Sequence, residues 1–288
     1  VPNDGSDDGE QVEASINIGN GAPSVSNVLL SPSPPFTETT LELSYDVSDP
    51  DGDTVDIAIT WYKNGDVIDG QTEKTLAPEF FVKGDNMYAE LTPSDGEATG
   101  AAEKSNSMKV ENTPPTIAGV SLSASEATEL TQVTCIPEGW TDPDTADTEE
   151  YAFLWYVNSE PSVTTDTITG DAFDKDETIF CEVTPMNGDA AGTPEISGTI
   201  KIENTPPVMS ALKVTPEGGT SNDTFFCTAV EPYDADPGHD ISYTVQWYVN
   251  GIQSVQQNSI DGEHFDKNDM LHCESTPSDT FDEGETYT

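Results

Sequence analysis

The chain has 288 residues, of which 34% are hydrophobic and 8% aromatic, a composition that favours folded domains over a disordered chain. Its 9 lysines are opposed by 55 acidic residues, giving a formal charge of -46. This charge excludes nucleic acid and anionic membrane surfaces as partners, because binding to phosphates needs clustered cations. The sequence has no run of 18 apolar residues, so we expect no membrane insertion.

A repeat of 92 residues organises the sequence. Asn20, Asn112 and Asn204 each end an alternating apolar and polar stretch, and each is followed within three residues by proline. Since a repeat of this length is enough for one small domain, we predict an N-terminal extension at 1–20 and three domains. The predicted domains are residues 21–112, 113–204 and 205–288.

Within the first repeat, alternation with a period of two predicts half-buried strands and no helix. We expect about seven strands, the clearest being residues 25–30, 41–47, 55–61, 74–76, 87–91 and 107–110. Asn64 and Gly65 predict a two-residue hairpin turn, because both turn positions tolerate positive φ. The second and third repeats follow the same order, so the predicted fold class is all-β.

The closing stretch Met108-Lys109-Val110 returns as Ile200-Lys201-Ile202, whereas the third repeat stops at Thr288, before its own copy. We therefore expect the third domain to lack its C-terminal strand. The head of the chain carries a matching stretch, which we interpret as a donor strand formed by Ala14, Ile16 and Ile18.

An incomplete sandwich exposes a sheet edge that can accept a strand from another chain. The expected function is therefore the structural subunit of an extracellular filament or pilus, in which identical molecules join head to tail. The alternative is that the chain is a piece of a longer repeat protein whose next residues supply the strand.

The four cysteines fall as one pair in each of the second and third repeats, with the same separation of 46 residues. This spacing suggests disulfides, which form outside the cytoplasm in oxidising compartments. We therefore expect an extracellular, cell-surface location. A tryptophan, Trp155 or Trp247, lies twenty residues after the first cysteine of each pair.

This order of Cys, Trp and Cys resembles the immunoglobulin-like (Ig-like) β-sandwich. The resemblance implies that Cys135 pairs with Cys181, that Cys227 pairs with Cys273, and that the tryptophan packs on the bridge. The first repeat departs from this pattern, because Leu43 and Ala89 occupy the cysteine positions.

The recurring phrases Trp-Tyr-x-Asn and Thr-Pro-Ser-Asp are similar to tandem Ig-like repeats of large bacterial surface proteins. That family implies an alternative function, a stalk or adhesin fragment of a larger cell-surface protein that binds a glycan or protein ligand. The donor-strand hypothesis in turn resembles pilin assembly by analogy of mechanism.

Each repeat also carries an acidic loop between two predicted strands. Hard oxygen ligands at alternating positions suit Ca²⁺, so Ca²⁺ is the expected cofactor, and no organic cofactor is expected. Solvated turn aspartates are the alternative interpretation. The candidate ligands are Asp49, Asp51 and Asp53, then Asp142, Asp144 and Asp147, then Asp234, Asp236 and Asp240.

The sequence gives little support to catalysis. The three histidines, His239, His264 and His272, all lie in the third repeat, and none recurs at the equivalent position of another repeat. His272 adjoins Cys273, but a disulfide explains that cysteine better than a Cys-His nucleophile does. We therefore predict that the protein is not an enzyme.

Overall fold

The computed structural model describes residues 5–6 and 10–288, so part of the predicted extension 1–20 lies outside the described residues. The chain divides into two compact units. Unit 1 is Val1–Pro114 with Asp142–Asp147, and unit 2 is Pro115–Thr141 with Thr148–Thr288. The finer division into three domains at 21, 113 and 205 stays a prediction.

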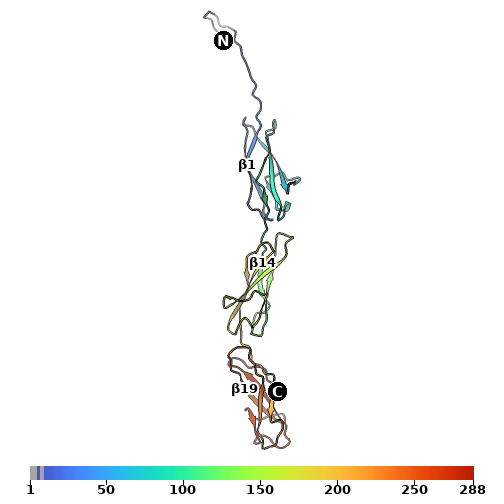
Figure 1. Ribbon diagram of the computed structural model, residues 1–288, viewed down its shortest axis with the longest axis vertical. Helices are drawn as coiled ribbons and strands as arrows, with labels where there is room; N and C mark the ends of the chain where they lie inside the picture. Colours follow the sequence, from blue (N-terminus) through green and yellow to red (C-terminus); the bar gives the residue numbers. More distant parts are fainter. Residues whose placement is uncertain (1–4, 7–9) are drawn as a thin grey trace. The chain divides into compact units, whose positions relative to one another are not determined.

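Unit 1 contains two antiparallel sheets that enclose one hydrophobic core, with β1 labelled in Figure 1. The strand order is β1-β2-β5 in one sheet and β4-β3-β6-β7 in the other, where β8 also pairs with β6. The strands are β1 (Ser24–Ser31), β2 (Leu41–Ser48), β3 (Asp56–Lys63), β4 (Asp66–Val67), β5 (Thr75–Leu76), β6 (Asn86–Ser94), β7 (Glu103–Lys104) and β8 (Met108–Lys109).

A short 3-10 turn at Pro78–Phe80 also lies in unit 1, although alternation alone predicted no helical residues. Pro78 begins this turn, where its missing N–H leaves no hydrogen bond unmade. Over the described residues, no helix is both long enough and apolar enough to cross a membrane.

Unit 2 contains two hydrophobic cores, each between two antiparallel sheets. The sheets of its first core have the orders β13-β10-β9 and β12-β11-β14-β15, with β16 also paired to β14. Its strands are β9 (Gly119–Leu122), β10 (Val133–Glu138), β11 (Glu150–Val157), β12 (Glu160–Pro161), β13 (Thr167–Ile168), β14 (Thr178–Met186), β15 (Glu195–Ile196) and β16 (Ile200–Lys201).

The other core of unit 2, which we call the third core, lies between sheets of order β17-β18-β21 and β20-β19-β22. Figure 1 labels β14 in the first core of unit 2 and β19 in the third core. The strands are β17 (Ala211–Thr215), β18 (Phe225–Val230), β19 (Ser242–Val249), β20 (Ile252–Gln253), β21 (Ser259–Ile260) and β22 (Leu271–Ser278). The all-β prediction is therefore confirmed.

The alternating sequence sets which face of each strand is buried. In β6, Met87, Ala89 and Leu91 are completely buried, and the residues between them are half-buried. Because successive side chains of a strand point to opposite faces, this sequence can bury one face against the core only as a strand. The predicted turn is also confirmed, since Asn64 and Gly65 both have positive φ.

Each core is centred on a fully buried tryptophan. In unit 2, Trp155 lies opposite Cys181 and Trp247 opposite Cys273 in the strand register. Each indole N–H donates to a backbone carbonyl, so burial leaves no polar atom of the ring unpaired. In unit 1 the partner of Trp61 is Ala89.

Both implied disulfides are present in the structure. Cys135 is bonded to Cys181 and Cys227 to Cys273, with Cα–Cα distances of 6.2 and 6.4 Å. Unit 1 has Leu43 and Ala89 at the corresponding positions, both fully buried. Its core therefore depends on packing without a covalent link between the sheets.

Candidate functional site

The acidic loops anchor the chain at the start of each repeat. The backbone N–H of Gly21 donates to Asp51 at 2.6 Å, that of Thr113 to Asp144 at 2.7 Å, and that of Thr205 to Asp236 at 2.8 Å. Hydrogen bonds to an ionised carboxylate are stronger than those between neutral groups. One structural role of the second aspartate in each loop is therefore to hold the start of the repeat in place.

The first acidic loop forms a turn. Asp49 accepts hydrogen bonds from the backbone N–H groups of Asp51 and Asp53 through one oxygen, at 2.8 and 3.1 Å. Within the described part of the first repeat, these carboxylates do not join a group close enough to share one cation. The structure therefore does not gather Asp49, Asp51 and Asp53 into one group of ligands.

The second acidic loop does form a cluster, which lies in unit 1. Asp142, Asp144 and Asp147 each place one oxygen within 4.8 Å of the others. The ammonium of Lys83 donates to both oxygens of Asp147, at 2.6 and 2.8 Å, and the hydroxyl of Thr37 donates to Asp144. A lysine of the protein therefore already provides positive charge at this cluster.

The third acidic loop forms a cluster in unit 2 with a different set of ligands. Asp234 and Asp236 meet His239 and Asp279, and Asp240 is not part of the group. The Nδ1 atom of His239 lies 3.9, 3.8 and 3.7 Å from carboxylate oxygens of Asp234, Asp236 and Asp279. We call these four residues the His239 cluster.

Sequence reasoning missed His239 and Asp279 as members of this cluster. Two signals were present: His239 follows Asp236 by three residues, as Asp147 follows Asp144, and Asp279 is the repeat equivalent of Asn187. The predicted ligands were chosen only from the aspartates inside each acidic loop. Asp279 comes from the end of β22, so pairing of β22 with β19 brings it to the loop.

The His239 cluster is shielded from solvent. The side chains of Asp234, Asp236 and Asp279 are 4%, 1% and 0% exposed. Burial raises the pKa of Asp279, but hydrogen bonds from the backbone of Asp282 and the side chain of Asn204 outweigh it, and the pKa is lowered. The pKa of the nearby Glu129 is raised by burial and by the negative charge of Asp236.

The third core has an open groove. Its cavity volume is about 820 Å³, and the lining includes Val214, Gly219, Phe225, Phe265, Asp269 and Leu271. Leu271 is half-buried there, whereas its repeat equivalents Met87 and Ile179 are completely buried. The apolar interior of the third core is therefore less covered than in the other two.

In unit 1 the position that corresponds to the groove of the third core is filled by Val110, which is completely buried. Its N–H donates to the carbonyl of Asp85 and its carbonyl accepts from Gly84, both at 2.8 Å. In unit 2, Ile202 makes the equivalent bonds to Glu177 and Asp176. In the third core, no described residue fills this position. Asn268 and Asp269, the repeat equivalents of the residues that bond Val110 and Ile202, line the groove.

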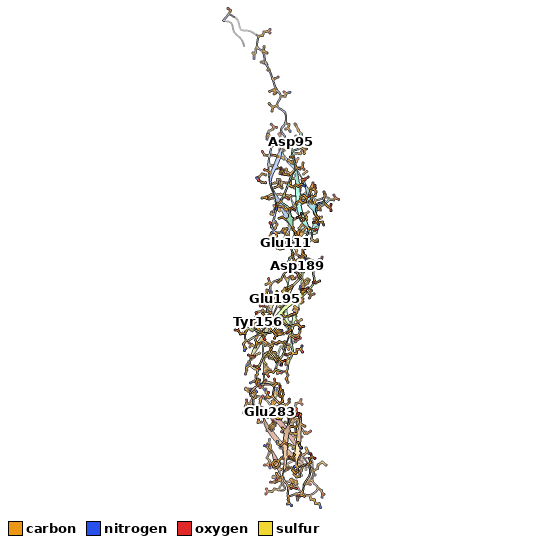
Figure 2. All side chains as sticks on the ribbon, in the orientation of Figure 1. Asp95, Glu111, Tyr156, Asp189, Glu195 and Glu283 are labelled. Atoms are coloured by element: carbon orange, nitrogen blue, oxygen red, sulfur yellow. A yellow bond between two sulfur atoms is a disulfide. The ribbon has the colours of Figure 1, made fainter. Side chains whose placement is uncertain are left out.

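The predicted donor residues lie away from any core. Ile16 and Ile18 are 84% and 83% exposed, and Ala14 is also exposed. The segment ends at Asn20, whose side chain donates to Asp95 at 2.9 Å. Figure 2 labels Asp95 at one end of unit 1 and Glu111, next to the closing residue Val110, at the other.

A search of protein-family models and a search of curated proteins each found no match. Several solved structures are similar. Sidekick-1 immunoglobulin domains 1–5 give a TM-score of 0.37 at 11% identity, covering 94% of this chain and 59% of that one. Chicken CNTN1 FN1–FN3 domains give 0.28 at 9% identity, with coverage of 93% and 95%. A Ca²⁺-stabilised adhesin of an Antarctic bacterium that binds ice gives 0.29 at 14% identity, with coverage of 94% and 73%.

Proposed function

We propose that this chain is a non-catalytic structural segment of an extracellular cell-surface protein, of the stalk or adhesin kind. The observation that carries the proposal is one contact made three times, the N–H of Gly21, Thr113 or Thr205 held by an aspartate of the following loop. A protein built from serial copies of one module, each anchored in the same way, is suited to spacing and display. Its ligand would be a glycan or a protein.

The disulfides support the proposed location. Two cross-linked cores fit a protein that folds and works in an oxidising compartment outside the cytoplasm. The formal charge of -46 fits a surface role, because like charge keeps neighbouring molecules soluble and apart.

For Ca²⁺ we propose a weak site at Asp142, Asp144 and Asp147, where all the grouped ligands are carboxylates. The Lys83 ammonium competes for Asp147, so we expect Ca²⁺ to bind only in the range of about 10⁻⁴ to 10⁻³ M that extracellular modules use.

Antibody labelling tests the proposed location and role. An antibody raised against the purified chain should label intact source cells, and brief protease treatment of those cells should release fragments that carry the antigen. An antibody against a cytoplasmic protein of the same cells is the control for lysis. Labelling that appears only after the cells are permeabilised would overturn the proposal.

The groove of the third core favours a second candidate function, head-to-tail assembly by strand complementation. In this proposal Ile18 of one molecule takes the position that Val110 and Ile202 fill in the closed cores. Ile16, two residues before it, lies on the same face of the donor strand. Burying each isoleucine contributes about 2 kcal/mol. Ordering each residue of the donor costs about 1 to 2 kcal/mol, so the gain must come mainly from closing the third core.

Sedimentation and electron microscopy of the full chain test this candidate. We expect polymers that disappear in Ile18→Glu but persist in the control Val12→Glu, since Val12 is equally exposed and lies outside the matching stretch. A peptide of residues 12–20 should cap assembly. Monomers at every concentration would contradict the candidate. The candidate would also be contradicted if the protein bound a peptide of residues 198–206 but did not bind the 12–20 peptide. That result would favour closure of the third core by a following repeat.

A further inference from the structure

The His239 cluster contains buried polar atoms that have no hydrogen-bond partner. The buried atoms without a partner are one oxygen of Asp234, one oxygen of Asp236 and the Nδ1 atom of His239. Asp236 is only 2% exposed, and its other oxygen accepts the Thr205 N–H. Unpaired buried polar atoms are uncommon in native proteins and each needs an explanation.

The geometry is wrong for hydrogen bonds but suitable for ligands of one ion. Nδ1 lies 3.7 to 3.9 Å from one oxygen of each of Asp234, Asp236 and Asp279, beyond hydrogen-bond distance. At Asp236 this is the oxygen that accepts the Thr205 N–H. Two ligands held about 2.1 Å from one tetrahedral ion would lie about 3.4 Å apart, so a small contraction would bring the four atoms into one coordination shell. Three buried carboxylates side by side also need positive charge, because an unpaired buried charge is costly.

The imidazole nitrogen decides which class of cation fits. Ca²⁺ and Mg²⁺ take oxygen ligands, whereas imidazole suits divalent transition metals. We propose that Asp234, Asp236, His239 and Asp279 form a site for a divalent transition metal of the Zn²⁺ class. This site adds His239 and Asp279 to the ligands predicted from the sequence, leaves out Asp240, and takes a different metal.

The equivalent lysine makes different contacts beside this cluster. Lys175 occupies the repeat position of Lys83, but its ammonium lies 3.2 Å from the ring centroid of Phe281 and 3.6 Å from Asp176. Phe281 in turn packs beside His239, with ring centroids 5.0 Å apart. The change from aspartate to histidine in this loop therefore coincides with a change in the contacts of the equivalent lysine, whose ammonium lies over the Phe281 ring.

Metal binding here would hold the start of the third repeat in place. Asp236 fixes the N–H of Thr205, and Asp279 and Asp282 accept from the side chain of Asn204 at 2.9 and 3.0 Å. An ion joining Asp236 to Asp279 would thus tie the 204–205 segment to two separate loops. We expect it to raise the melting temperature, as any ligand of the native state does.

The test uses the full chain after dialysis against a chelator. Calorimetric titration and thermal unfolding are measured with Zn²⁺, Co²⁺ and Ca²⁺ added as the metals alone, and Co²⁺ also reports its coordination by visible absorption. We expect Zn²⁺ to raise the melting temperature more than Ca²⁺ at equal concentration. His239→Ala should weaken Zn²⁺ binding at least about tenfold, and His239→Asp should reverse the preference towards Ca²⁺.

The controls are the other two histidines, which His264→Ala and His272→Ala remove one at a time. His264 contacts Asp261 and His272 stacks on Tyr248, so both lie outside the His239 cluster. Zn²⁺ binding that survives in both controls and is lost in His239→Ala supports the proposal. No Zn²⁺ binding by the unchanged protein, equal binding by His239→Ala, or a larger effect of Ca²⁺ than of Zn²⁺ would overturn it.

Discussion

Lys83 and Asp147 form a two-pronged ion pair, in which one ammonium donates to both carboxylate oxygens at 2.6 and 2.8 Å. The Asp147 side chain is 8% exposed, so most of its charge is removed from water. At the equivalent place in the next repeat, His239 faces three carboxylates and Lys175 lies over an aromatic ring. In one loop a lysine of the protein therefore balances one carboxylate, whereas we propose that in the other loop a metal ion supplies the positive charge.

Replacing Lys83 with methionine should make the acidic cluster of unit 1 depend on an added cation. Lys83→Met leaves the Asp147 carboxylate without this ammonium, and we expect a loss of about 1 to 3 kcal/mol in the free energy of unfolding. Millimolar Ca²⁺ should restore part of that loss. Thermal unfolding with and without Ca²⁺ measures both effects. Lys74→Met, which removes an exposed lysine near Glu42, is the matched control and should change neither.

Unit 1 should accept the disulfide that the other cores carry. Leu43 and Ala89 are fully buried and occupy the positions of Cys135 and Cys181. The double variant Leu43→Cys with Ala89→Cys should form the bond in air and gain up to about 4 kcal/mol from loop closure, reduced by the loss of the leucine packing. Melting temperatures with and without reductant measure the gain. Leu43→Cys alone should only be destabilised, and a double variant that stays reduced would contradict the prediction.

The fold was accessible from the sequence because its signals are local and repeated. Alternation in β6 and β14 fixed which face is buried, and the Asn64-Gly65 turn needed only its two residues. The pairing of Cys135 with Cys181 followed from the resemblance to Ig-like sandwiches and not from spacing alone. Short strands such as β4 and β7 carry too few residues for a pattern, and the sequence did not distinguish them.

A glycine near the end of each repeat should be sensitive to any side chain. A Cβ atom on Gly192 would lie 1.9 Å from the carbonyl oxygen of Pro115, so the backbone would have to move. We expect Gly192→Ala to lower the free energy of unfolding by about 1 to 3 kcal/mol, as overpacking does. Gly198→Ala is the control, since a Cβ there meets no atom within 4 Å. Chemical denaturation compares the two, and equal stability would contradict the assigned contact.

The candidate sites were harder to predict because they depend on contacts between distant residues. Asp279 joins Asp236 only after β22 pairs with β19, and the spacing inside one loop does not contain that information. The aspartates of the first loop have the most regular spacing. One oxygen of Asp49 nevertheless accepts hydrogen bonds from two backbone N–H groups of its own turn. The groove of the third core also depends on the packing of distant residues such as Phe225 and Phe265, which the sequence does not show.

The pKa of the Asp95 carboxyl should report whether the Asn20 side chain is hydrogen-bonded to it. The hydrogen bond from the Asn20 side chain, followed by those from the N–H groups of Ala98 and Glu97, lowers its pKa below the usual 3.8. Its contribution to stability is therefore present above that value and is lost as the pH falls through the lower folded-state pKa. Asn20→Ala should raise the pKa, measured by NMR titration. Asn27→Ala, which removes a donor to Asp46, is the control and should leave the pKa of Asp95 unchanged.

Stretching single full-length molecules is the sharpest test of whether the chain is a structural segment made of cross-linked sandwiches. We predict discrete unfolding events in which residues 135–181 and 227–273 stay locked in the oxidised protein. After reduction, two of the events should each lengthen by about 160 Å, the reach of 46 extended residues. Extension without discrete events, or events of the same length before and after reduction, would contradict the claim.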